Sequence, residues 1–83
     1  MLEFKFDTQL LIDGHDLDED AINDYFTQNL KGDCLLAVGD EDLIKIHFHT
    51  NEPWEVLKYC ATLGDIYDVV VENMQRQEDG LQG

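Results

Sequence analysis

The fold of this chain is decided by one stretch, Ile44-Lys45-Ile46-His47-Phe48-His49-Thr50-Asn51-Glu52-Pro53. Hydrophobic and polar residues alternate along its first half, which is the pattern of a β-strand with one buried face. Because successive side chains of a strand point to opposite faces, the two histidines share the polar face with the lysine. The Thr-Asn-Glu-Pro turn that follows is typical of a helix start, since proline fits the first helical turn.

The same alternation is found near the beginning of the chain, over residues 2–12. The apolar side of this segment carries Leu2, Phe4, Phe6, Leu10 and Ile12. Its polar side carries Glu3, Lys5, Asp7 and Gln9. We therefore expect a second half-buried strand, in which Phe4 and Phe6 are buried together with Ile44, Ile46 and Phe48.

Two segments have the spacing of apolar residues that amphipathic helices show. The first spans about residues 19–31, with Asp18 as its N-cap and Gly32 as its stop signal. The second begins at Pro53 and ends before Gly64. The apolar stripes of the two helices are formed by Ile22, Tyr25, Phe26 and Leu30, and by Val56, Leu57, Cys60 and Leu63.

Two further strands complete the pattern, over residues 34–38 and 65–72, and a Gly-Asp-Glu-Asp hairpin turn follows the first of them. The order strand, helix, strand, strand, helix, strand is the split βαβ arrangement of ferredoxin-like folds. The sequence thus predicts one α+β domain over residues 1–74, with a four-stranded antiparallel sheet and both helices on one face. Residues 75–83 are polar and predict a tail or a linker.

Length, charge and cysteine content exclude several classes of protein. The 83 residues make one domain and leave no room for a complete kinase, dehydrogenase or hydrolase. The formal net charge of −14 argues against nucleic acids and anionic membranes as partners. We expect neither a signal peptide nor a membrane-spanning run, and 2 cysteines without a CxxC motif fit a reducing, cytoplasmic location.

The predicted fold places a candidate metal site on the sheet face that the helices leave bare. His47 and His49 lie there two residues apart, and parity puts Asp7 of the first strand on the same face. Two imidazoles and a carboxylate suit a divalent transition metal such as Zn, Mn or Fe. The alternative interpretation is a pair of exposed histidines without a metal.

Cys34 is a further candidate ligand. The hairpin brings it opposite Ile46 or His47, and the sequence leaves this register open. The alternative interpretation of this cysteine is a small buried hydrophobic residue.

Four segments resemble one family of proteins: Gly32-Asp33-Cys34-Leu35-Leu36, Gly39-Asp40, Lys45 through Pro53, and Glu72-Asn73-Met74-Gln75-Arg76-Gln77. The family is the middle domain of the dihydroxyacetone-kinase-like proteins, which include fatty acid kinase A. The resemblance covers roughly residues 5–77, and the ordered pairing of His-x-His-Thr with Glu-Asn-Met carries most of its specificity.

This resemblance implies a larger protein, with a nucleotide-binding kinase domain before the middle domain and a further domain after it. Such proteins phosphorylate a fatty acid that a separate binding protein carries. The resemblance also implies that His47 and His49 match a metal-binding pair whose usual partner is a cysteine on the first strand. Asp7 stands where that cysteine would be, and oxygen in place of sulfur is expected to weaken the hold on zinc and broaden metal choice.

Three functions are open at this point. The first is a non-catalytic accessory or regulatory module of a kinase-like phosphotransfer system, whose partners would be a fatty-acid-binding protein and a kinase-like domain or subunit. No nucleotide is expected on this chain, because the motifs of the kinase domain are absent. The second is a stand-alone ferredoxin-like homo-oligomer that senses a metal or a small ligand. The third is a small metal-dependent enzyme.

The bare sheet face also bears on assembly. It is expected to carry Leu11, Leu43 and Val70, and an apolar patch of this kind is hard to leave in water. Edge strands of a sheet also invite pairing with another chain. We therefore expect a homo-oligomer, or a monomer whose sheet face docks on a partner.

Overall fold

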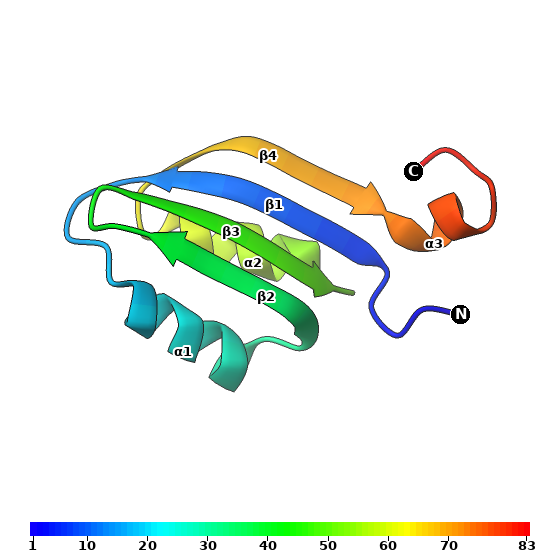
Figure 1. Cartoon of the computed structure of the whole chain (residues 1–83), viewed down its shortest axis with the longest axis horizontal. Helices are drawn as coiled ribbons and strands as arrows, with labels where there is room; N and C mark the ends of the chain where they lie inside the picture. Colours follow the sequence, from blue (N-terminus) through cyan, green and yellow to red (C-terminus); the bar gives the residue numbers. More distant parts are fainter.

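The computed structural model describes residues 1–83, and its elements follow the predicted order (Figure 1). They are β1 (Phe6–Asp13), α1 (Glu19–Asn29), β2 (Gly32–Gly39), β3 (Leu43–Thr50), α2 (Pro53–Ala61), β4 (Asp65–Asn73) and α3 (Met74–Glu78). The four strands form one antiparallel sheet in the order β2-β3-β1-β4. This confirms the predicted α+β fold with its split βαβ arrangement.

Helices α1 and α2 pack on one face of the sheet and form a single hydrophobic core with it. The core contains Leu10, Ile12, Ile22, Phe26, Ala37, Ile44, Ile46, Phe48, Val56 and Cys60. The even-numbered residues of β1 and β3 face the helices, as the alternation predicts. Phe26 of α1 meets Phe48 of β3 edge-on at 5.1 Å between ring centroids, and Tyr25 stacks on Tyr59 of α2 at 3.6 Å.

The beginning of β1 differs from the prediction. The strand starts at Phe6 instead of residue 2, and both Phe4 and Phe6 are only partly buried. The side chain of Asn51 accounts for this later start, because it forms hydrogen bonds with the backbone of the segment before β1. Its Oδ1 accepts a hydrogen bond from the Lys5 N–H at 3.0 Å, and its Nδ2 donates to the Glu3 carbonyl at 2.8 Å.

Edge strand β2 contains a bulge that the sequence does not reveal. Between the pairs Asp33–His49 and Leu36–His47, β2 has two residues where β3 has one. Cys34, the first of these two residues, has a φ of 54°, which is in the left-handed region that favours glycine. The extra residue shifts the alternation of the strand, so Leu36 faces the bare side of the sheet.

The other edge strand has a matching irregularity. Between Tyr67 and Val70, two residues of β4 lie opposite Leu10 of β1, and Asp68 there has a φ of 49°. Bulges at both edges increase the local twist of the strands and hinder pairing with the sheet of another molecule.

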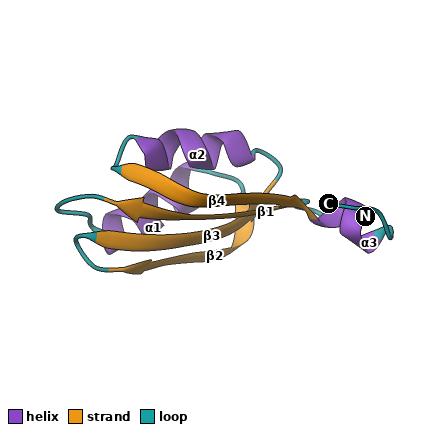
Figure 2. Ribbon diagram, turned by 90° about the horizontal axis from the view of Figure 1, so that it is seen from above, coloured by secondary structure: helices purple, strands orange, loops and turns teal.

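The end of the chain contains one short helix, α3. Asn73 caps this helix by accepting a hydrogen bond from the Arg76 N–H at 3.0 Å. Helix α3 and both chain ends lie together beyond one end of the sheet (Figure 2). None of the helices is long and apolar enough to span a membrane.

The buried Thr8 hydroxyl, on the helix-covered side of β1, has no hydrogen-bond partner. Because an unpaired buried hydroxyl costs free energy and valine has the same shape, Thr8→Val is expected to raise the free energy of unfolding by about 1 kcal/mol. Urea denaturation followed by circular dichroism measures this change.

Thr50→Val is the matched control, since Thr50 is equally buried but well paired. Its hydroxyl donates to the Lys31 carbonyl at 2.8 Å and accepts from the Glu52 N–H at 3.1 Å. This variant is expected to lose about 1 kcal/mol of stability. A loss of stability in both variants would show that the Thr8 hydroxyl is satisfied after all.

Candidate metal centre

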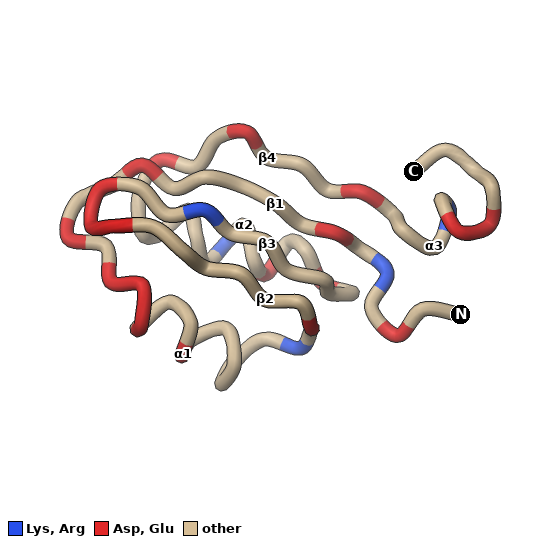
Figure 3. The backbone as a smooth tube through the Cα atoms, in the orientation of Figure 1, with Lys and Arg blue, Asp and Glu red and all other residues tan.

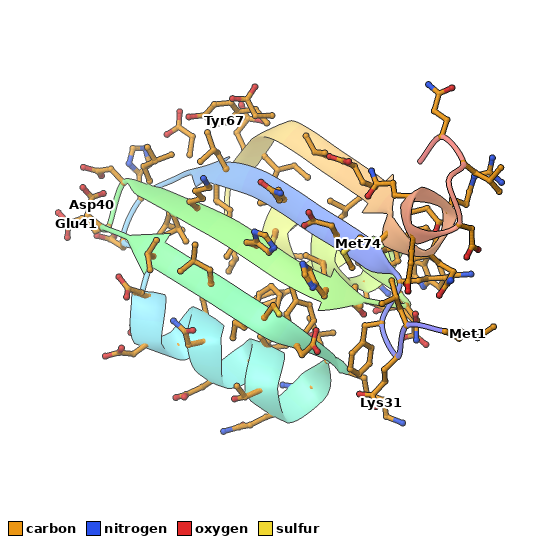
Figure 4. All side chains as sticks on the ribbon, turned by 45° about the vertical axis from the view of Figure 1, so that its right-hand side comes forward. Met1, Lys31, Asp40, Glu41, Tyr67 and Met74 are labelled. Carbon is orange, nitrogen blue, oxygen red and sulfur yellow. The ribbon has the colours of Figure 1, made fainter.

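Three side chains with metal-ligating atoms meet on the sheet face that α1 and α2 leave bare. Asp7 comes from β1, and His47 and His49 come from β3. The pairing of these central strands positions them, because Asp7 lies opposite His49 and Gln9 lies opposite His47. The group is near the end of the sheet at which Met74 and Lys31 are labelled in Figure 4, away from the turn with Asp40 and Glu41.

The ligand atoms of these three residues converge. His47 Nε2 lies 3.0 Å from His49 Nε2, and Asp7 Oδ1 lies 3.3 Å from the former and 3.8 Å from the latter. Ligand atoms around a tetrahedral zinc ion are about 3.3–3.6 Å apart, given bonds of about 2.0–2.2 Å. The structure thus brings together the three residues that strand parity selected, at separations close to those of a metal site.

The surroundings restrain both the carboxylate and the imidazoles. Gln9 Nε2 donates to both oxygens of Asp7, at 3.4 Å to Oδ1 and 3.1 Å to Oδ2. Between the two facing Nε2 atoms only one hydrogen can be shared, so at least one of them presents a lone pair. The side chains of Asp7, His47 and His49 are 19–30% exposed, so a metal ion could reach them from solvent.

The sequence predicts that Cys34 lies opposite Ile46 or His47, and this prediction is wrong. Leu36 lies opposite His47 and Ala37 opposite Ile46, whereas Cys34 is in the β2 bulge. The alternative of a small buried residue is also wrong, because Cys34 is exposed. The extra residue of the bulge causes both differences.

The second cysteine belongs to the core, as its place on the apolar stripe of α2 predicts. Cys60 is fully buried, and this burial raises the pKa of its thiol to about 12. A thiol with such a pKa is protonated at neutral pH and is a poor metal ligand.

Acidic residues gather at the opposite end of the molecule, around the start of α1 and the β2–β3 turn (Figure 3). Several of them are engaged with the backbone. Asp18 Oδ1 accepts from the Ala21 N–H, Asp40 Oδ1 accepts from the Leu43 N–H, and Glu19 accepts from the Gly39 N–H. Helix capping and turn formation account for these carboxylates.

One residue beside the metal centre is not among those that the sequence predicts. Asp33 Oδ1 lies 3.8 Å from His49 Nδ1, on the side away from Asp7. Its proximity follows from its place opposite His49 in the β2–β3 pair. Nothing in the sequence reveals this register, because the apolar run of β2 lacks alternation.

Comparison with known proteins shows what the chain is similar to. The family of FakA-like middle domains, which takes its name from fatty acid kinase A, matches residues 3–81. Protein YloV of Bacillus subtilis is 33% identical over 82 residues, which are 96% of this chain and 15% of that protein. An uncharacterized protein of Staphylococcus epidermidis is 37% identical over 59 residues, which are 61% of this chain and 11% of that protein.

An uncharacterized protein of Staphylococcus saprophyticus is 41% identical over 46 residues, which are 55% of this chain and 8% of that protein. The chain therefore spans no more than 15% of the length of the curated relatives named here. These proteins are much longer than the domain that they share with this chain.

Proposed function

Because this chain belongs to the family of FakA-like middle domains, we propose that it acts as a non-catalytic accessory module of a kinase-like phosphotransfer system. Two facts support this role. The family match covers nearly the whole chain, and the chain corresponds to a small part of its longer relatives. A fatty acid as substrate and a fatty-acid-binding protein as partner belong to this proposal, because the family resemblance implies them.

The proposed module holds a divalent transition metal, with His47, His49 and Asp7 as ligands. The observation that carries this proposal is the convergence of their ligand atoms within 3.0–3.8 Å on the bare sheet face. Zn, Mn and Fe are all compatible with two imidazoles and one carboxylate. A metal there would tie β1 to β3 and place positive charge on the surface of an acidic protein.

The same face is the proposed docking surface. Leu36 lies opposite His47, Val70 lies opposite Gln9, and cross-strand partners share a face. The exposed apolar residues of this face are Leu36, Val38, Leu43, Tyr67 and Val70, each 40–42% exposed. An apolar surface of this kind marks a contact with another protein surface. We propose that a kinase-like domain covers it, with a second copy of this chain as the alternative occupant.

Zinc titration of the full chain tests the metal site. His47→Ala and Asp7→Asn are each expected to lower zinc affinity at least about tenfold, because each removes one ligand and about 1.4 kcal/mol is a factor of ten. Affinity is also expected to fall in acid, since only a neutral imidazole has a lone pair for the metal. Isothermal titration calorimetry measures both effects.

His15→Ala is the matched control for these variants, because His15 is an exposed histidine in the turn before α1. It should bind zinc as the wild type does. A wild-type chain that ignores Zn, Mn and Fe, or variants that bind as tightly as wild type, would reduce the centre to two exposed histidines.

Asp7→Cys tests the same site with a change that is expected to strengthen zinc binding. Thiolate is a softer ligand than carboxylate, so this variant is expected to bind zinc more tightly than wild type, by about tenfold or more. Asp13→Cys is the control, because it adds a thiol at the exposed far end of the same strand. Equal gains in the two variants would mean that the added thiols bind zinc without the histidines.

Sedimentation velocity tests the docking surface. Wild type is expected to self-associate or to bind a separately purified kinase-like domain of the family. Leu36→Lys and Val70→Lys are expected to weaken that association at least about tenfold, since they place a charge in an apolar contact. Trp54→Lys is the control, because Trp54 is 59% exposed on α2. A strictly monomeric chain without affinity for the kinase-like domain would contradict this role.

A further inference from the structure

A second group of ligating side chains surrounds the other nitrogen of His49. It consists of Asp33 and Cys34 of β2 together with His49, and their ligand atoms lie within 4.8 Å of one another. Asp33 Oδ1 is 3.8 Å from His49 Nδ1, while His49 Nε2 faces His47 on the opposite side of the ring. The His49 imidazole thus lies between two groups of ligand atoms.

The bulge in β2 creates this second group. In a regular strand, neighbouring side chains point to opposite faces, so Asp33 and Cys34 could not both reach one residue of β3. The left-handed backbone of Cys34, with a φ of 54°, turns its side chain out of that alternation. This conformation is strained for a residue other than glycine, and strain of this kind is often found at functional sites.

We propose that Asp33, Cys34 and His49 form a second, thiolate-containing metal site, suited to zinc or another thiophilic divalent ion. One sulfur, one nitrogen and one oxygen atom provide three ligands, and water can complete a tetrahedral set. Ligand atoms within 4.8 Å need shifts of about 1 Å to reach the spacing of such a set, which exposed side chains can make. Binding releases the thiol proton of Cys34 to solvent and uses the lone pair of His49 Nδ1.

The two sites compete for one imidazole. A neutral imidazole has a single lone pair, so His49 offers either Nδ1 to the β2 side or Nε2 to the β1 side. With Nδ1 on a metal, the Nε2–H can donate to His47 Nε2, across the 3.0 Å contact that the structure shows. One metal ion per chain is therefore expected at saturation. Both sites use His49, so a metal at the second site excludes the metal of the proposed function from the first.

Cobalt(II) titration of the full chain under nitrogen tests the second site, because a thiolate ligand produces an intense near-ultraviolet charge-transfer band. His47→Ala, which removes a ligand of the first group, is expected to bind cobalt more weakly than wild type but to show the sulfur band. Cys34→Ser is expected to show no band and still to bind cobalt through Asp7, His47 and His49. Asp33→Asn is expected to lower cobalt affinity in the His47→Ala background, and Asp65→Asn, at the far end of β4, is the control for lost charge.

Several outcomes would overturn the second site while sparing the first. Absence of the sulfur band in every variant would leave Asp33 as a carboxylate that only orients His49. A band that disappears with His47→Ala would make Cys34 a ligand of the first group. Two cobalt ions per chain would contradict the sharing of one imidazole between the sites. A sulfur band found only in a dimer, as sedimentation would reveal, would contradict a site formed within one chain. Loss of the sulfur band when His49→Ala is added to His47→Ala, with intact circular dichroism, supports the second site.

Discussion

The antiparallel pairing of β1 with β3 is the constraint on which the rest of this structure depends. It aligns Asp7 with His49 and Gln9 with His47, and it directs Leu10 and Ile46 into the core. A slip of one residue would move every side chain of the strand to the other face. It would expose apolar side chains whose burial is worth about 2 kcal/mol each, and it would bury both imidazoles. The core therefore enforces the register, and the register brings together the three residues of the candidate metal centre.

The central strands and helices could be predicted because their signals are local. Alternation in β1 and β3 and the apolar stripes of α1 and α2 can each be recognised within a dozen residues. The edge strands are different, because the apolar run of β2 has no alternation and its bulge depends on a residue other than glycine adopting positive φ. The prediction therefore failed for Cys34 and missed Asp33. It also extended β1 too far, because the hydrogen bonds from Asn51 come from a distant turn.

The acidic residues of this chain have different roles in different parts of the structure. Many carboxylates cap α1 or shape turns at the end of the sheet opposite the metal centre (Figure 3). The bare face combines Lys45 and two imidazoles with carboxylates, among them Asp7, Asp33 and Glu72, and exposed apolar side chains lie on the same face. The field of an acidic chain attracts cations to partly buried ligands, and screening by salt weakens such attraction least where water is excluded. A metal ion and a docking partner therefore suit the same face.

Imidazole is the side chain that could serve two metal positions here, because its ligand atoms point in divergent directions. His49 lies on the strand between β1 and β2, so it meets an oxygen ligand on one side and a thiol with a second carboxylate on the other. Sulfur favours softer ions such as zinc, whereas oxygen tolerates manganese and iron. The tautomer of one ring would then decide which neighbouring strand is linked to β3 by metal. Linkage to β2 would also hold the bulge, since the metal would bind the residue with the left-handed backbone.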